Sequence, residues 1–92
     1  MKTRVHVVVS GRVQGVFYRA SAAEKADDLG LTGWVRNTRE GDVEAVFEGD
    51  EAAVREMLAW CQRGPVLAKV TSVKAIPEQF TGEFTMFTIR YE

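Results

Sequence analysis

The sequence predicts one α+β domain over residues 1–92, and three observations lead to this expectation. The length is enough for one hydrophobic core but not for two. Segments in which apolar residues alternate with polar ones, as in strands, are interrupted by two segments with the periodicity of helices. Apolar residues make up 46% of the chain and charged residues 27%, a balance typical of globular rather than disordered proteins.

The first two predicted elements are a strand and a helix. Val5, Val7 and Val9 occupy alternate positions, so a strand there buries its odd-numbered face. Residues 19–30, "RASAAEKADDLG", place small apolar residues at helical spacing and finish on a glycine that suits a helix end. The junction between the two elements is "SGRVQGVFYR", residues 10–19, which contains two glycines and two arginines.

A hairpin and a second helix come next. Residues 31–38, "LTGWVRNT", and 42–49, "DVEAVFEG", predict two strands joined by a turn over "REG". We expect Asp50 to cap the following helix and Gly64 and Pro65 to end it. The apolar residues of this helix recur at i, i+3, i+4 and i+7: Val54, Met57, Leu58 and Cys61.

Two more strands complete the pattern. Residues 70–76, "VTSVKAI", predict a strand that Pro77 either stops or marks as a sheet edge, and residues 84–91, "FTMFTIRY", alternate again. The resulting order is that of a ferredoxin-like βαββαβ sandwich, with an antiparallel sheet, two helices on one face and a short extra C-terminal strand. The pattern leaves open which sheet edge takes that last strand.

Composition excludes several classes of function. The formal net charge of −1 argues against a general nucleic-acid surface. An RNA-binding domain of the same topology would carry aromatic residues on its central strand, which here reads "RVHVVVS". No apolar run approaches the ~20 residues of a membrane span or resembles a signal peptide, so we expect no membrane partner and a cytoplasmic protein. The one cysteine, Cys61, cannot form an intrachain disulfide and fits a small core residue.

The loop after the first strand and Asn37 are predicted to lie together. The first and second strands point the same way, so their C-terminal ends share one end of the sheet. Asn37 has the parity of Val35, which directs it toward the helix layer. A glycine-containing loop that leads into a helix presents unpaired N–H groups, as in anion sites. The alternative is a loop that binds nothing, and neither the Walker nor the dinucleotide motif is present.

Arg19 and Asn37 each have two interpretations. A cation in the first turn of a helix opposes the macrodipole, and a bound anion would relieve Arg19, whose planar guanidinium can hold two phosphate oxygens. Arg19 can instead be a solvated surface residue. Asn37 can hold a water by donating and accepting, or it can be an ordinary turn residue ahead of "TREGD".

Two segments carry a resemblance to a known family. "GRVQGVFYR" followed by "GWVRNTREGDVEAVFEG" resembles the two signature segments of the acylphosphatase family, and the βαββαβ order matches over essentially the whole chain. One departure is Tyr18, where the family usually has Phe or Met. The resemblance implies an enzyme that hydrolyses acyl phosphates to a carboxylate and inorganic phosphate, without metal or cofactor. It implies a small-molecule acyl phosphate as the partner, and we expect a monomer.

The resemblance also implies roles for individual residues. Arg19 would bind the phosphate and Asn37 would position the attacking water. The backbone amides of the loop would cradle the phosphate, and these belong to Gln14, Gly15, Val16, Phe17, Tyr18 and Arg19. The alternative to an enzyme is a non-catalytic module that binds carbamoyl phosphate or a similar anion.

The remaining titratable residues of the sheet are not expected to take part. His6 lies five residues before Gly11, about 16 Å back along the strand, and its parity points it to the other face. Glu44 and Glu48 share that face. We therefore expect His6 to be an exposed sheet residue, and Glu44 and Glu48 to be solvated rather than a pair of acids.

Overall fold

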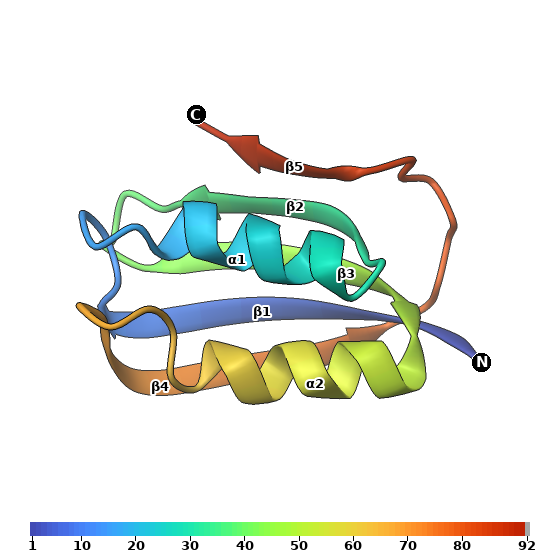
Figure 1. Ribbon diagram of the computed structural model, residues 1–92, viewed down its shortest axis with the longest axis horizontal. Coiled ribbons are helices and arrows are strands. Elements are labelled where there is room, and N and C mark those ends of the chain that lie inside the picture. The colour runs from blue at the N-terminus through green and yellow to red at the C-terminus, as the bar shows by residue number, and fades with distance from the viewer. Residues whose placement is uncertain (92) are drawn as a thin grey trace.

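One sheet of five strands, covered on one face by two helices, makes up the computed structural model, which describes residues 1–91. The predicted α+β order is confirmed (Figure 1). Along the chain the elements are β1 (Lys2–Arg12), α1 (Tyr18–Asp28), β2 (Thr32–Asn37), β3 (Val43–Asp50), α2 (Glu51–Cys61), β4 (Lys69–Glu78) and β5 (Phe87–Arg90). In this described part, neither helix is long and apolar enough to cross a membrane.

The strand order β4-β1-β3-β2-β5 answers the question that the sequence left open. β5 lies at the edge beside β2 and pairs with it in parallel, whereas all other neighbours are antiparallel. β4 forms the opposite edge and includes Pro77, so the reading of that proline as an edge residue is confirmed. β1, β2 and β5 all point the same way, and their C-terminal ends lie at the left of Figure 1.

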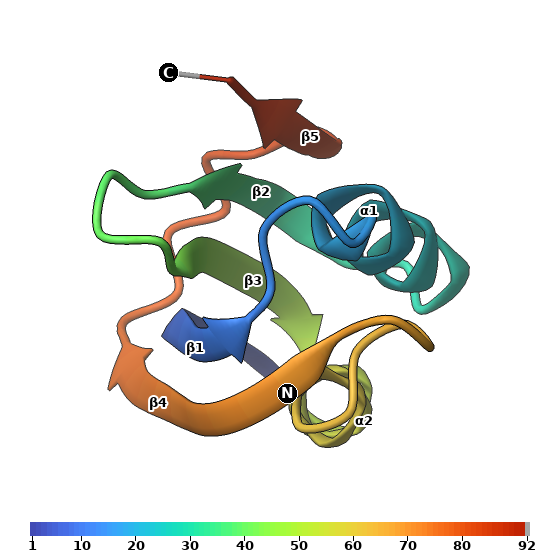
Figure 2. The same cartoon turned by 90° about the vertical axis from the view of Figure 1, so that its left-hand side faces the viewer.

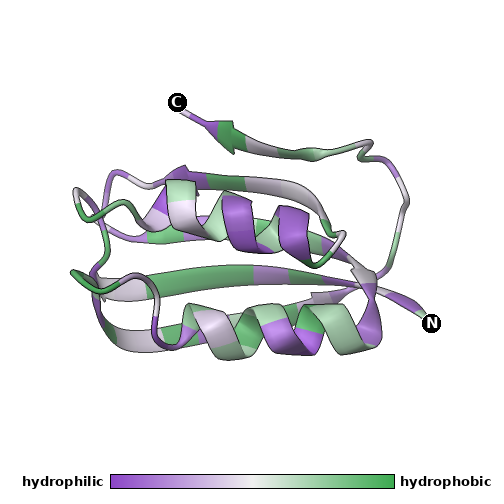
Figure 3. Ribbon diagram, viewed as in Figure 1, coloured by the Kyte–Doolittle hydropathy of each residue, from purple (hydrophilic) through white to green (hydrophobic). Residues whose placement is uncertain are grey.

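The core lies between the sheet and the helices. The odd-numbered valines of β1 are buried as predicted, and Figure 3 shows the apolar stretch of this strand behind the helices. Across the sheet Phe47 of β3 stacks on Phe87 of β5, with ring centroids 5.4 Å apart. The helices contribute small or flexible residues, which let them approach the sheet closely: Ala22, Ala26, Val54, Met57 and Cys61.

The start of α2 differs from the prediction in its details. Asp50 is the N-cap residue, but its carboxylate makes no capping hydrogen bond. It lies instead 3.4 Å from Nζ of Lys2 at the start of β1. The β1–β3 pairing brings these two residues opposite each other, so the aspartate has a competing cationic partner.

The prediction for Glu48 is wrong. Residues 79–86, which connect β4 to β5, cross the sheet face opposite the helices (Figure 2). They bury the Glu48 side chain completely, and its carboxylate accepts hydrogen bonds from the backbone N–H groups of Thr81 and Gly82 and from Arg4 Nη1 at 3.2 Å. Burial alone would raise the pKa of Glu48, but the hydrogen bonds from Thr81 and Arg4 outweigh it and lower the pKa.

Glu44 and His6 are also paired rather than solvated. Glu44 Oε2 lies 2.6 Å from His6 Nε2, and Arg36 Nε donates to Glu44 Oε1 at 2.7 Å. Burial works to raise the pKa of Glu44, but the bonds from His6 and Arg36 lower it overall. These contacts lie on the face away from the helices, so the exclusion of His6 from the loop site agrees with the structure.

Candidate functional site

The loop between β1 and α1, residues 13–17, has a backbone suited to anions. φ is +76° at Gly15 and +67° at Phe17, whereas Val16 between them has an ordinary negative φ. Alternation of this kind turns successive N–H groups toward one side and makes a concave anion-binding surface. Val13 and Val16 are buried, so the loop is anchored in the core while its polar backbone stays accessible.

The N–H groups of this loop have no hydrogen-bond partner among the described residues. Among residues 1–91, no carbonyl or side chain accepts a hydrogen bond from the backbone N–H groups of residues 14–19. The first internal bond of α1 at this end runs from Ser21 N to Phe17 O, at 3.0 Å. The unpaired donors coincide with the positive end of the helix dipole, so the loop can solvate a negative charge.

Arg19 lies in the first turn of α1, which contains no acidic residue. Its side chain is half-buried, and its guanidinium carbon lies 4.9 Å from the ring centroid of Tyr91, just beyond β5. Within the described residues, no carboxylate lies within salt-bridge distance of Arg19. The guanidinium thus retains donors for a ligand while the aromatic ring restricts its position.

Asn37 ends β2 and carries the most informative atom of the region. Its Oδ1 is buried, and it has no hydrogen-bond partner among the described residues. A buried acceptor without a donor costs roughly 1–3 kcal/mol, and natural proteins keep few of them. A molecule that brings its own donor, such as water, can satisfy an acceptor of this kind.

Gln14 joins the loop to the end of β2, a contact that sequence reasoning missed. Its side-chain amide donates to the carbonyl oxygens of Thr38 at 2.8 Å and of Asp42 at 2.9 Å. These carbonyls lie on the two sides of the β2–β3 hairpin, since Thr38 directly follows Asn37 and Asp42 directly precedes β3. The predicted meeting of loop and hairpin is therefore realised through the side chain of Gln14, for which only the backbone amide had a predicted role. The "NTREGD" turn itself gives no sign that its carbonyls face a donor.

Tyr18 fixes the start of α1. Its ring is buried and lies 5.3 Å from that of Trp60, centroid to centroid, and its hydroxyl donates to the carbonyl oxygen of Cys61 at 2.9 Å. Burial raises the pKa of the phenol far above its usual value, so it stays protonated. The hydroxyl that departs from the family pattern thus has a structural partner in α2.

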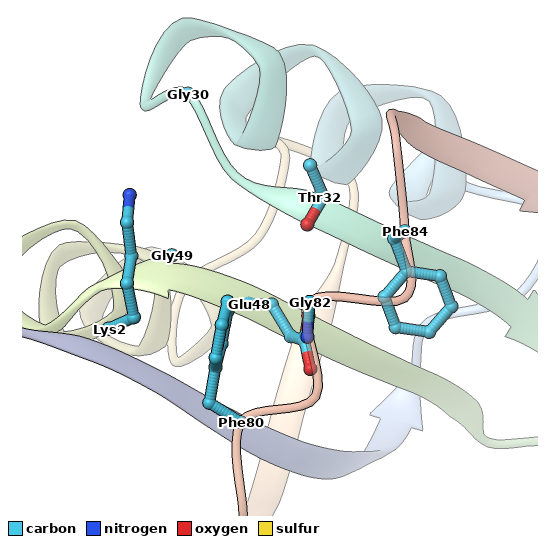
Figure 4. A pocket seen from close by; sticks show the side chains of 8 residues that line it. All are labelled: Lys2, Gly30, Thr32, Glu48, Gly49, Phe80, Gly82 and Phe84. Atoms are coloured by element: carbon cyan, nitrogen blue, oxygen red, sulfur yellow. The ribbon is translucent and has the colours of Figure 1, made fainter.

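A cavity of about 200 Å³ lies at the other end of the sheet, away from this loop. Figure 4 shows it between the start of β1, the end of β3 and residues 80–84. Its acidic group, Glu48, has its carboxylate occupied by internal hydrogen bonds, and its cationic group, Lys2, pairs with Asp50. This arrangement does not present free charged groups to a ligand. Within residues 1–91, no three His, Cys, Asp or Glu side chains come close enough to hold a metal ion.

Comparisons with known proteins agree on one family. A family model described as Acylphosphatase matches residues 5–89. A curated acylphosphatase of Methylococcus capsulatus is 62% identical over 86 residues, which is 94% of each chain.

Solved structures give the same result. An acylphosphatase from Coxiella burnetii superposes with a TM-score of 0.92 at 40% identity, covering 97% of this chain and 93% of that one. An acylphosphatase from Bacillus subtilis superposes with a TM-score of 0.93 at 33% identity, covering 99% of this chain and 100% of that one.

Proposed function

The chain belongs to the acylphosphatase family of hydrolases, and from this premise we propose that it cleaves the mixed anhydride between a carboxylic acid and phosphate. The observation that carries the proposal is the buried Oδ1 of Asn37, which has no hydrogen-bond partner among the described residues. The hairpin that follows Asn37 is bonded through the side chain of Gln14 to the loop, whose N–H groups also lack partners there. The proposal thus combines donors suited to phosphate with an acceptor suited to water. Hydrolysis of a phosphoryl compound needs this combination.

In the proposed complex, Arg19 and the loop hold the phosphoryl group. Arg19 donates to two of its oxygens, and the backbone N–H groups of Gln14, Gly15, Val16, Phe17, Tyr18 and Arg19 surround it. Charge on the phosphoryl oxygens is then neutralised by donors that need no rearrangement during the reaction. The Tyr91 ring supports this role because it limits the movement of the guanidinium.

Asn37 positions the attacking water in line with the bond that breaks. Its Oδ1 accepts a hydrogen bond from the water, whose oxygen forms a bond to phosphorus. The bond between phosphorus and the acyl oxygen breaks, and the carboxylate leaves with the electron pair. The proton of the water passes to a phosphate oxygen of the substrate. A rate independent of phosphate basicity across a series of acyl phosphates would contradict that last step.

The chemistry requires neither a general acid nor a metal. The leaving carboxylate has a conjugate-acid pKa of roughly 4, so it departs without protonation at neutral pH. Arg19 and the oriented amides supply the positive charge that a metal ion supplies in many phosphoryl-transfer enzymes. We therefore propose a metal-independent, cofactor-free hydrolase. That residues 1–92 form one domain, and that the protein is a cytoplasmic monomer, stay predictions for sedimentation and localisation experiments.

Hydrolysis of acetyl phosphate in the presence of EDTA tests the proposal. We expect turnover by the wild type, a loss of about 10³-fold or more in kcat/KM for Arg19→Ala, and about 10²-fold for Asn37→Ala. Arg55→Ala is the matched control, because this exposed arginine pairs with Glu51 on α2, away from the loop. Circular dichroism confirms that each variant is folded.

Binding of inorganic phosphate, measured beside hydrolysis, distinguishes an enzyme from the alternative, a non-catalytic binding module. If the wild type binds phosphate through Arg19 but hydrolyses no acyl phosphate, the loop binds the anion without catalysing a reaction. The protein is then the alternative, a module that binds carbamoyl phosphate or a similar anion. If Arg19→Ala retains full activity, the assignment of the phosphate site is wrong.

A further inference from the structure

The cavity beside residues 80–84 takes no part in the proposed hydrolysis and lies at the other end of the sheet. Thr32 of β2 and Glu48 of β3 are cross-strand partners and therefore share one face of the sheet, the face opposite the helices. The connection from β4 to β5 passes over this face and adds Phe80 and Phe84 to the lining (Figure 4). Two aromatic side chains of a surface connection thus border a hollow and do not belong to the core.

The size of the cavity suits a molecule with one ring. Its volume is about 200 Å³, and a cavity of about 150 Å³ with apolar walls is enough to hold benzene. Drug-sized ligands occupy pockets of roughly 300 Å³ or more. A Cβ at Gly30 would have no heavy atom within 4 Å, so the cavity is open on this side.

The aromatic walls are held in place by the sheet. The guanidinium carbon of Arg4 lies 5.4 Å from the centroid of the Phe84 ring. Between the two phenylalanines, Thr81 and Gly82 donate backbone N–H hydrogen bonds to the Glu48 carboxylate at 3.0 and 3.2 Å. A ligand that packs against these rings therefore does not have to order a free segment first.

The charges around the cavity favour an uncharged ligand. The carboxylate of Glu48, buried beneath the cavity, already accepts internal hydrogen bonds, and Nζ of Lys2 lies 3.4 Å from Asp50 Oδ1. A ligand carboxylate would compete with Asp50 for Lys2 and would lie near the negative charge of Glu48. Any ion would also lose hydration that these paired groups do not replace.

Thr32 supplies a polar group that the fold does not use. The threonine hydroxyls that form hydrogen bonds in the described part of the chain belong to Thr38 and Thr81. The hydroxyl of Thr32 forms none there, and Figure 4 shows it directed into the cavity. Because a hydroxyl both donates and accepts, it can pair with one O–H group of a ligand whose ring contacts the phenylalanines.

We propose that this cavity binds a small uncharged aromatic molecule with one hydroxyl group, the chemical class of the phenols. The ring packs between Phe80 and Phe84, and the hydroxyl forms a hydrogen bond with Thr32. Water is a poorer occupant, because an ordered water needs roughly two to four polar partners and the phenyl rings offer none. The site lies apart from the loop between β1 and α1, so this inference does not rest on the proposed function.

Titration of the whole chain with phenol, followed by NMR of the backbone amides, tests the inference. We expect saturable shifts of the signals of Thr32 and Gly82, with a Kd on the order of 1 mM for a ligand of this size. Benzoate has the same ring but a negative charge, and it should bind at these residues at least about tenfold more weakly.

Thr32→Val tests the hydroxyl, because valine keeps the shape of threonine and suits a strand. Toluene has the ring without the hydroxyl, so we expect the Kd of phenol divided by that of toluene to rise about 3- to 10-fold in this variant. Phe80→Ala should weaken the binding of both molecules about tenfold and leave their ratio unchanged. Thr71→Val is the matched control, because Thr71 is an exposed threonine of β4 that does not line the cavity.

The location and the selectivity of binding decide the outcome. Without saturable shifts at Thr32 and Gly82, the cavity does not bind phenols and the inference is wrong. Shifts confined to residues 14–19, or an equal change of the ratio in Thr71→Val, would contradict it as well. Benzoate that binds at these residues as tightly as phenol would overturn the preference for an uncharged ligand.

Discussion

The side-chain amide of Gln14 donates to the carbonyl oxygen of Thr38 at 2.8 Å, across 24 residues of sequence. A second bond from the same amide reaches the Asp42 carbonyl oxygen. One side chain thereby sets the position of the loop relative to Asn37, the neighbour of Thr38. In the proposed complex the anion and the water are held by different segments, so their alignment would depend on this connection.

Replacement of Gln14 by Met should therefore impair turnover more than phosphate binding. Methionine has a similar length but donates no hydrogen bond, so the loop and hairpin can shift by a fraction of an ångström to an ångström. A misplacement of that size costs up to about 10²-fold in kcat. We expect kcat to fall about 10- to 100-fold, while the inhibition constant of inorganic phosphate changes by less than about threefold.

Gln79→Met serves as the control for Gln14→Met, since Gln79 is exposed in the segment after β4. It should behave as the wild type. A Gln14→Met enzyme with unchanged kcat would show that the loop and hairpin keep their alignment without the amide. Equal losses in kcat, phosphate affinity and thermal stability would point to a purely structural role.

Acid should destabilise the protein through Glu48. The folded state lowers the pKa of Glu48 below the ordinary value of a glutamate, so its contribution to stability is fully present above that ordinary value. The contribution is lost as the pH falls through the folded-state value. We expect the free energy of unfolding, measured with urea, to change little between pH 7 and 5 and to fall as the pH drops below the ordinary pKa of a glutamate.

The variant Glu48→Gln identifies the group responsible. Glutamine keeps the shape but weakens the bonds from Arg4 and Thr81, so stability at pH 7 should fall by roughly 1–3 kcal/mol. The remaining dependence on pH should be shallower than in the wild type. An acid transition as steep as that of the wild type would assign the effect to other carboxylates, among them Glu44.

Cys61 should resist thiol reagents in the folded protein. It is 1% exposed, and burial raises the pKa of its thiol to about 11. Because the thiolate is the reactive form, labelling at pH 8 should be more than about 10²-fold slower than for a free cysteine. Labelling in denaturing urea should be immediate. Rapid labelling of the native protein would mean that the C-terminal end of α2 opens readily.

Phe17→Asn should raise the stability of the folded protein. Asparagine reduces the strain of the left-handed conformation, and little buried surface is lost because the ring is mostly exposed. We expect a gain of roughly 1 kcal/mol in the free energy of unfolding, equivalent to about 4–8 °C in Tm for a domain of this size. Met86→Asn, at a position of ordinary backbone, should show no gain. A lower Tm for Phe17→Asn would mean that the ring makes stabilising contacts.

Much of the fold could be predicted because its signals are local. The alternate valines of β1 and the helical spacing of Val54, Met57 and Cys61 each report burial on one face, which the structure confirms. Strand direction then sufficed to place Asn37 at the same end of the sheet as the loop. The roles of Arg19 and Asn37 are not a matter of fold and stay predictions until they are measured.

What escaped prediction depends on contacts between distant segments. Glu48 has the alternation of an exposed strand residue, and only the passage of residues 79–86 over that face buries it. Residues 79–83 have no periodicity that would predict where this segment runs. The side-chain bonds of Gln14 escaped for the same reason, since their acceptors are backbone carbonyls, which every residue of the hairpin possesses.

The two edges of the sheet have a consequence for aggregation. An exposed edge strand offers unpaired N–H and C=O groups on which another chain can add a strand. Here one edge, β4, carries Lys69, Lys74 and Pro77, and the other, β5, has only four residues. Lysine, proline and shortness each oppose the growth of intermolecular β-structure. Fibril formation by this protein should therefore require the loss of an edge strand first. The rate of fibril formation should then depend on how fast the protein unfolds, and not on protein concentration alone.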